Sequence, residues 1–176
     1  MGMAATSLPE NATNAQLIRW AFDVINSHDI TPLRAHWTPE SVERFPDRTC
    51  RGAEEIAAYF EGLFAAVPDV HMEVLHLVAD GDDVFVRWHL TGSHTGTAWA
   101  GIETTGKRIE VDGMDHFTVR DGKIVSNFVV FDQMEVGRQL GLLPPDGSPA
   151  DRALKAAFNA KTKVADAIRE RRGSAA

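Results

Sequence analysis

The stretch KRIEVDGMDHFTVRDGKIVSNFVVFDQM, residues 107–134, decides the fold of this chain. Apolar and polar residues alternate on both sides of Asp121-Gly122, and this dipeptide between two such runs is the strongest short-range signal of a β-hairpin. Residues 70–80 and 82–94 form a second pair of alternating runs, joined by a Gly-Asp turn. Between the hairpins, residues 95–106 are rich in Gly and Thr, which is typical of a loop that can reach over the mouth of a pocket.

The first part of the chain shows the period of α-helices instead. Apolar residues recur at helical spacing in residues 14–27 and again in residues 53–67, and Thr31-Pro32 begins a short helix between them. Residues 41–45 are predicted to be a brief strand, followed by a loop over residues 44–52. Helices followed by antiparallel hairpins predict an α+β domain, with the helices on one face of a curved sheet that leaves a cone-shaped cavity.

A further helix is predicted over residues 148–172, where Ser148 is the cap and Pro149 the first helical residue. One face of this helix is apolar and needs a cover, either its own domain or a second subunit; it comprises Leu154, Ala157, Phe158, Val164, Ala165 and Ile168. The expected organisation is a flexible N-terminus at 1–12, one α+β domain at 13–146 and a C-terminal helical extension at 147–176.

Composition narrows the classes of partner. The chain has 176 residues, 44% of them hydrophobic, and a net charge of −7, so neither nucleic acid nor an anionic membrane is an expected partner. No apolar stretch approaches the ~20 residues of a spanning helix, and the start lacks the layout of a secretory signal. The single cysteine, Cys50, fits a reducing compartment, so a cytoplasmic location is expected. The histidines lack the spacing of metal ligands, so no metal is expected. No nucleotide-binding motif is present, so no nucleotide is expected either.

Four strings, in this order and spacing, resemble the SnoaL-like polyketide cyclase family: GAEEIAAYFEGLFAAVPDV, VFVRWHLTGSHTG, TTGKRIEV and VRDGKIVSNFVVFDQMEVGRQLGLLP. The similarity covers roughly residues 15–144. It implies the cone-shaped fold of the nuclear transport factor 2-like superfamily, with an apolar internal pocket and a homodimer formed through the sheet. It also implies an enzyme of cyclase or isomerase type that acts on a small apolar oxygenated molecule, polyketide- or ester-like, without a cofactor.

The resemblance implies that Asp132 is the catalytic acid/base, because in these cyclases an Asp at the end of the last long strand acts on an enolisable polyketide. Alternation along residues 124–132 places Phe128 and Asp132 on one face. If that face looks inward, Phe128 lines the pocket, and burial raises the pKa of Asp132 towards neutrality, as a base for a proton next to a carbonyl requires. The alternative is a strand-end Asp that caps the turn at 133–141.

Two further catalytic candidates follow from the superfamily. Asp115 resembles the protonated carboxylic acid in the oxyanion hole of ketosteroid isomerase, and the alternative is an exposed Asp on an edge strand. The neighbouring His116 points to the opposite strand face. His94, in GSHTG, is similar to a cyclase motif and is expected to donate to a substrate oxygen at the pocket mouth.

The sequence also departs from the isomerase pattern. The isomerase has its general base on the first short strand, where this chain offers Arg44 or Phe45, and the Tyr of its first helix is replaced by Trp20 or Ala21. Steroid isomerisation is therefore not expected, and Phe45 and Trp20 are assigned to substrate binding. The missing base favours, as an alternative function, a non-catalytic domain that binds a small molecule.

Arg87 and His89 share one strand face and are candidates for substrate binding. Beside a strand-end Asp they partly resemble the limonene epoxide hydrolases, which surround a water molecule with Asp, Arg and Asp, so hydration is a second alternative reaction. The competing interpretation is a cross-strand ion pair at the surface. Trp99, in the loop between the hairpins, is predicted to act as a lid over the pocket.

Overall fold

A computed structural model describes residues 7–173 of the chain. The predicted N-terminal segment 1–12 and extension 147–176 reach beyond these limits, so residues 1–6 and 174–176 lie outside the described part, as does the side chain of Ile168. The elements in chain order are α1 (Asn14–Asn26), the 3₁₀ helix η1 (Thr31–His36), β1 (Val42–Arg44), β2 (Thr49–Arg51), α2 (Gly52–Ala66), β3 (His71–Asp80), β4 (Asp83–Ser93), β5 (Arg108–Arg120), β6 (Lys123–Phe131), α3 (Gln133–Leu140) and α4 (Pro149–Gly173).

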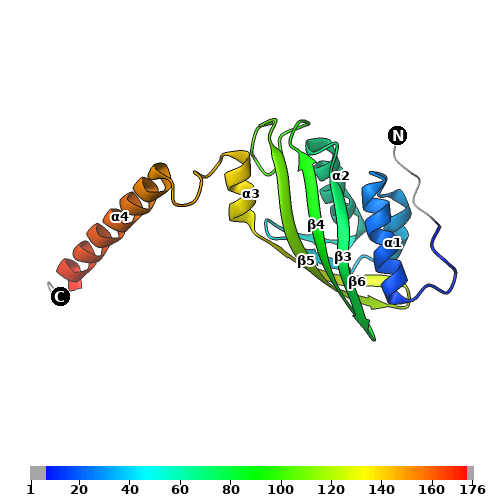
Figure 1. Cartoon of the computed structure of the whole chain (residues 1–176). Helices are drawn as coiled ribbons and strands as arrows, with labels where there is room; N and C mark the ends of the chain where they lie inside the picture. The colour runs from blue at the N-terminus through cyan, green and yellow to red at the C-terminus, as the bar shows by residue number, and fades with distance from the viewer. Residues whose placement is uncertain (1–6, 174–176) are drawn as a thin grey trace.

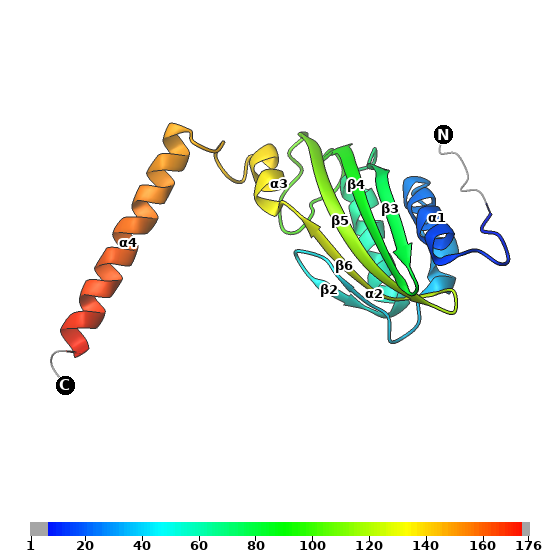
Figure 2. The ribbon, with the colours of Figure 1, turned by 60° about the horizontal axis from the view of Figure 1, so that its bottom comes forward.

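The strands form one curved, open sheet in the order β2-β1-β6-β5-β4-β3. All neighbours are antiparallel except β1 and β6, which run parallel. The helices α1 and α2 lie against one face of the sheet, and β1 and β2 lie beside β6 (Figures 1 and 2). The predicted α+β fold with helices on one face of a curved sheet is confirmed, with one parallel strand pair added.

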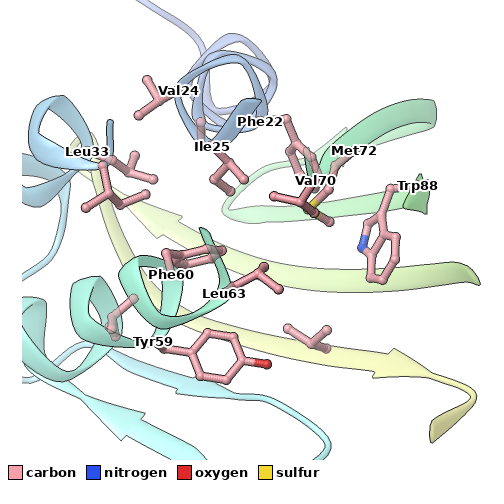
Figure 3. Packing of buried hydrophobic residues seen from close by; sticks show 14 of the residues in the cluster. Phe22, Val24, Ile25, Leu33, Tyr59, Phe60, Leu63, Val70, Met72 and Trp88 are labelled. Carbon is pink, nitrogen blue, oxygen red and sulfur yellow. The ribbon is translucent and has the colours of Figure 1, made fainter. Parts of the chain in front are cut away.

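Local chemistry explains where the first helices form. Thr13 and Gln16 make a capping box at the start of α1: the Thr13 hydroxyl accepts from the Gln16 backbone, and the Gln16 side chain accepts from the Thr13 backbone. Pro32 lies in the first turn of η1, where its missing N–H costs nothing. The apolar faces of α1 and α2 meet β3 and the indole of Trp88 between the helices and the sheet (Figure 3).

Two elements were not predicted. The strand β2 lies inside the segment expected to be a loop, because residues 49–51 pair with β1 and Cys50 turns into the core. The helix α3 lies where only a turn was expected. Asp132 caps its start, Val136 and Leu140 bury its apolar side, and Gly141 ends it with a φ of 84°.

The tail helix, α4, is confirmed, and it stands apart from the rest of the molecule beyond α3 (Figures 1 and 2). Ser148 lies where the sequence places the cap, and its hydroxyl accepts from the Asp151 backbone at 3.1 Å. Across residues 7–173, none of the helices combines the length and the apolar character that crossing a membrane requires.

Candidate functional site

Two carboxyl groups are buried in the core of the domain. They belong to Glu43 on β1 and Asp115 on β5, which are 2% and 6% exposed, and we refer to them as the carboxyl pair. Charged side chains are rarely buried to this extent unless they are hydrogen-bonded or paired. The carboxyl pair is therefore the feature of the core that most needs a chemical explanation.

The sheet register brings the carboxyl pair together through β6. Glu43 is the parallel partner of Asn127, and Asn127 is the antiparallel partner of Phe117, two residues beyond Asp115. Side chains two positions apart on a strand share a face, so all of these point to the same side of the sheet. Three different strands thus place two carboxyl groups and one amide in a single buried cluster.

Each member of the carboxyl pair accepts a hydrogen bond from an indole. Trp37 Nε1 donates to Glu43 Oε1 at 2.8 Å, and Trp88 Nε1 donates to Asp115 Oδ1 at 2.9 Å. Asn127 Nδ2 bridges the two, at 3.4 Å from Glu43 Oε2 and 3.2 Å from Asp115 Oδ2. Asn127 Oδ1 is buried and has no hydrogen-bond partner among the described residues. This oxygen is an acceptor available to a molecule that enters the cluster.

The Trp88 indole reaches Asp115 only because residue 113 lacks a side chain. Gly113 is the cross-strand partner of Trp88, and a Cβ atom built on it would lie 2.1 Å from Cζ2 of the indole. Such a contact is far shorter than any real carbon–carbon packing distance. Gly113 therefore lets the ring lie across β5 and aim its N–H at the carboxyl group two residues along that strand.

Burial raises the pKa values of the two carboxyl groups by different amounts. Loss of water, followed by repulsion from Asp115, raises the pKa of Glu43 from 4.5 to about 8. Loss of water raises the pKa of Asp115 from 3.8 to about 6, against hydrogen bonds from Trp88 and Asn127 that lower it. Near pH 7 the cluster thus holds one neutral carboxylic acid and one carboxylate, which is the arrangement of a general acid beside a general base.

Three cavities, each sharing lining residues with the next, follow one another from the carboxyl pair towards α3. The innermost, of about 40 Å³, is lined by the carboxyl pair, Asn127 and both indole donors. It shares lining residues, Trp88 among them, with an apolar cavity of about 60 Å³. That cavity shares Trp99 with a wider mouth of about 280 Å³, beside α3. We call this series of cavities the passage; it is mostly apolar, with a polar, ionisable inner end.

Phe45 and Trp99 lie along this passage, where they were predicted to be. Both line the apolar cavity, and Phe45 stacks on Tyr59 with ring centroids 3.7 Å apart. Trp99 also borders the mouth, and its backbone pairs with Ile102 to form a small hairpin in the loop. A lid role for Trp99 remains a prediction that this placement supports.

His94 does not face the passage. Its ring is buried, with Nε2 3.1 Å from the Thr97 carbonyl oxygen and Nδ1 3.3 Å from the Thr105 hydroxyl. Both nitrogens are thus engaged within the loop, and the loop ends are also joined by a backbone bond between His94 and Lys107. The position predicted for His94, at the pocket mouth, is corrected to that of an anchor for the loop.

The predicted inward orientation of Asp132 and Phe128 is wrong. The pairing of β5 with β6 shifts register so that Val125 is an extra residue, a β-bulge, and alternation changes phase beyond it. The buried face is therefore that of Asn127 and Val129, whereas Phe128 is 52% exposed on the outer face. Asp132 is exposed and accepts from the Glu135 backbone at 3.0 Å, which is the capping alternative.

Arg87 and His89 lie on the outer face, where Asp112 holds both at 2.7 Å. The surface interpretation is correct. Arg87 therefore cannot serve hydration of the epoxide-hydrolase type inside the passage. Trp20 packs edge-to-face on His36, with ring centroids 5.3 Å apart, and lines none of the three cavities described above. Its assignment to substrate binding is corrected to packing between α1 and η1.

Of the predicted catalytic residues, only Asp115 lies in the buried cluster, and β5 is a central strand, not an edge. The first short strand does carry a buried carboxyl group, Glu43, which sequence reasoning missed. A signal was present: Phe45 was expected to line the pocket, and alternation places the residue two positions earlier on the same face. His116 points away from Asp115 as predicted, towards Asp83.

Comparison with known proteins agrees with the fold. Solved structures similar to this chain include AclR, a candidate hydroxylase from Streptomyces galilaeus, at 27% identity and a TM-score of 0.65 over 88% of this chain and 92% of that one. IdmH, a candidate polyketide cyclase from Streptomyces antibioticus, is 26% identical, with a TM-score of 0.64 over 74% of this chain and 99% of that one. A Catenulispora acidiphila protein with a ketosteroid isomerase-like fold is 18% identical, with a TM-score of 0.62 over 78% of this chain and 100% of that one.

The curated proteins contain no match to this sequence. The similarity to solved structures shows a curved α+β sheet of the nuclear transport factor 2-like kind. The sequence pattern of one family matches residues 15–140, which is most of the chain. The chain therefore belongs to the SnoaL-like polyketide cyclase family.

Proposed function

We propose that this chain is an enzyme that moves a proton to and from a carbon atom next to a carbonyl group, in an apolar oxygenated substrate of polyketide- or ester-like type. The observation that carries the proposal is the carboxyl pair, held at the end of an apolar passage with one group neutral and the other ionised near pH 7. A cyclase or an isomerase needs such an acid and base side by side. Family membership supports the same class of substrate.

In the proposed step, the Asp115 carboxylate takes the α-proton while the Glu43 carboxylic acid donates a hydrogen bond to the carbonyl oxygen. The electron pair of the broken C–H bond then forms an enolate that Glu43 stabilises. In isomerisation, protonated Asp115 returns the proton to a carbon of the enolate. In cyclisation, the enolate carbon attacks a second carbonyl, a carbon–carbon bond forms, and Asp115 returns the proton to the oxygen of that carbonyl.

Asn127 is proposed as a positioning residue. Its Nδ2 holds one oxygen of each carboxyl group, and its free Oδ1 can accept from a substrate hydroxyl. The aromatic lining of the passage, which includes Phe45, Tyr59 and Trp88, favours a flat apolar body. The small inner cavity receives only the reacting end of the substrate, and the rest occupies the apolar cavity and the mouth.

The test follows exchange of α-protons for deuterium in D₂O by NMR, with 2-tetralone and a cyclic β-ketoester as apolar, enolisable probes. The native chain is expected to accelerate the exchange, and Asp115→Asn to slow it about 10²- to 10⁴-fold because the base is lost. Glu43→Gln keeps a donor and is expected to lose less than Glu43→Leu. Asp112→Asn, on the outer face of the same strand, is the control and should retain the native rate.

The second candidate function is binding without turnover, which the small volume of the inner cavity favours. This alternative predicts that both probes bind while exchange stays at the background rate in the native chain and in every variant. Equal exchange by native protein and Asp115→Asn would refute the enzymatic proposal. A cytoplasmic location, expected from the sequence, belongs to the same proposal.

A further inference from the structure

The turn between β1 and β2 places a further carboxyl group on the passage, at the opposite end from the carboxyl pair. The Phe45 backbone donates to the Arg48 carbonyl oxygen at 2.8 Å, which closes a tight turn over residues 45–48. Asp47 lies in this turn and lines the mouth. Among the described residues that line the apolar cavity and the mouth, it is the one with a charged side chain. The passage is therefore polar at both ends and apolar between them.

Tyr59 and Arg48 hold the Asp47 carboxyl group in place. The Tyr59 side chain extends from α2 (Figure 3), lines the apolar cavity and donates from its hydroxyl to Asp47 Oδ1 at 3.3 Å. Arg48 Nε donates to Asp47 Oδ2 at 3.2 Å, and Arg48 Cζ lies 5.7 Å from the centre of the Tyr59 ring. Burial, and then the charge of Asp47, raises the pKa of Tyr59 well above its ordinary value, so its hydroxyl stays a neutral donor. Asp47 is thus held by its neighbours, with a side chain only 18% exposed.

Both of these bonds are long, which leaves Asp47 able to accept a stronger one. Hydrogen bonds from N–H and O–H donors in which the acceptor is a carboxylate are typically about 2.5–2.9 Å long, whereas those of Asp47 measure 3.2 and 3.3 Å. A carboxylate has about four acceptor positions, and the described residues occupy two of those on Asp47. Because Arg48 already balances the negative charge, a second cation gains little here. The group that fits is a neutral donor, a hydroxyl.

The strand β6 sets the distance between the two polar ends. Asn127 lines the inner cavity, and Phe131 lines both the apolar cavity and the mouth that Asp47 borders. Alternate residues of a strand share a face, so Asn127, Val129 and Phe131 form one side of the passage along about 13 Å of strand. A molecule whose carbonyl group reaches the carboxyl pair therefore brings groups about 13 Å away next to Asp47.

We propose that Asp47 determines substrate specificity by accepting a hydrogen bond from a hydroxyl group at the far end of the substrate, about 13 Å from the reacting carbonyl group. Tyr59 is the positioning residue that keeps the Asp47 carboxylate at the mouth. The identity of the reacting end rests on the proposed function, whereas the hydroxyl site rests on the mouth alone. The substrate class narrows to long, flat ketones with a distal hydroxyl. A site of this kind rejects an isostere without the hydroxyl, since its acceptor is then left unpaired.

The test compares two probes that differ only in this hydroxyl. One is 2-tetralone with a hydroxypropoxy chain at carbon 6, and the other has a butoxy chain, in which a methyl group replaces the hydroxyl. Pairs with chains one carbon shorter and longer cover the span. Calorimetry gives the Kd of each probe for native protein, Asp47→Ala and the control Asp80→Ala, which changes an exposed carboxyl group at the end of β3. Circular dichroism confirms that each variant is folded.

The measured quantity is the ratio of the butoxy Kd to the hydroxyl Kd, compared between proteins. This comparison removes the general effect of the apolar chain, as in a double-mutant cycle. For at least one chain length, the ratio in the native chain and in Asp80→Ala should exceed that in Asp47→Ala about tenfold or more, the effect of a hydrogen bond to a charged group. Asp47→Asn keeps the shape and an acceptor oxygen, so it should retain part of the preference. Tyr59→Phe should lose less than Asp47→Ala, because the acceptor remains.

Deuterium exchange with the same probes separates this inference from the proposed function. A hydroxyl preference that Asp47→Ala abolishes, with exchange at the background rate, would support the site at the mouth and refute the proposed reaction. Accelerated exchange, with ratios in native protein and Asp47→Ala that agree within about twofold at every chain length, would overturn the inference and leave the reaction intact. Failure of the native chain to bind any of the hydroxyl probes would overturn it as well.

Discussion

Replacement of Glu43 by Gln is expected to stabilise the protein, and to do so only at pH values where the Glu43 carboxyl group is ionised in the unfolded chain. The folded state raises the pKa of Glu43 from 4.5 to about 8 because the group is buried beside Asp115. Because the pKa is raised on folding, the native protein keeps its full stability below pH 4.5. It loses stability progressively as the pH rises from there through 8. Gln has nearly the same shape, keeps an oxygen for the Trp37 indole and never ionises.

The size of the gain follows from the difference between the pKa of Glu43 in the folded state and its ordinary value. Each tenfold difference in proton affinity between the folded and unfolded states is worth about 1.4 kcal/mol. The free energy of unfolding of the Gln variant should exceed the native value by less than about 1 kcal/mol at pH 4.5, about 2 kcal/mol at pH 6 and about 3 kcal/mol at pH 7. At pH 9 the difference should reach about 5 kcal/mol. Above pH 8 the difference levels off, because the native carboxyl group is then ionised in both the folded and the unfolded state.

The assay is urea denaturation of both proteins at one fixed concentration, at pH values from 4.5 to 9. Glu40→Gln is the control, since Glu40 is exposed near the start of β1 and its replacement should change stability by less than about 0.5 kcal/mol throughout. A difference between Glu43→Gln and native protein that is the same at pH 4.5 and pH 9 would show that Glu43 is not the source of pH-dependent instability. The reasoning about the carboxyl pair would then be wrong.

Three more outcomes are expected. The rate of deuterium exchange should follow a bell-shaped pH curve with limbs near 6 and 8, because the base must be ionised and the acid protonated; a rate that still rises above pH 9 would contradict this assignment. Gly113→Ala should lower the melting temperature, at a cost of about 1–3 kcal/mol of stability, and slow exchange, because the new methyl group displaces Trp88. Gly62→Ala, in an open position on α2, should instead gain up to about 1 kcal/mol, and calorimetry compares the two. Asp132→Ala should cost about 1 kcal/mol through loss of the helix cap, with exchange unchanged, whereas a loss of activity at unchanged stability would restore Asp132 to the site.

Sequence reasoning succeeded for the features that short-range chemistry controls. The Asp121-Gly122 turn joins β5 to β6 where it was predicted, with both residues at positive φ, and the α4 helix begins at the expected Pro149. Such signals involve residues a few positions apart, so they survive whatever the rest of the chain does. The family resemblance supplied the arrangement of these parts in space.

The assignment of strand faces failed where a distant strand decides the outcome. Alternation counted from Ile124 places Phe128 inside, but the bulge at Val125 reverses the phase and puts Asn127 inside instead. A bulge depends on the pairing partner, and one extra residue moves every later side chain to the other face. Glu43 was missed for a related reason: its burial depends on pairing of β1 with β6, and the one local sign of it was alternation with Phe45.

The energetic cost of the carboxyl pair is itself an argument for its use. At pH 7 the raised pKa values correspond to about 3 kcal/mol of lost stability for each group, against a total of about 5–15 kcal/mol for a typical domain. Apolar residues of similar volume at the two positions would remove this loss. Two indoles and one amide are instead arranged to donate hydrogen bonds to the pair. A core selected for stability alone would not hold two carboxyl groups, so the Glu43 and Asp115 variants that are most stable should also be the least active.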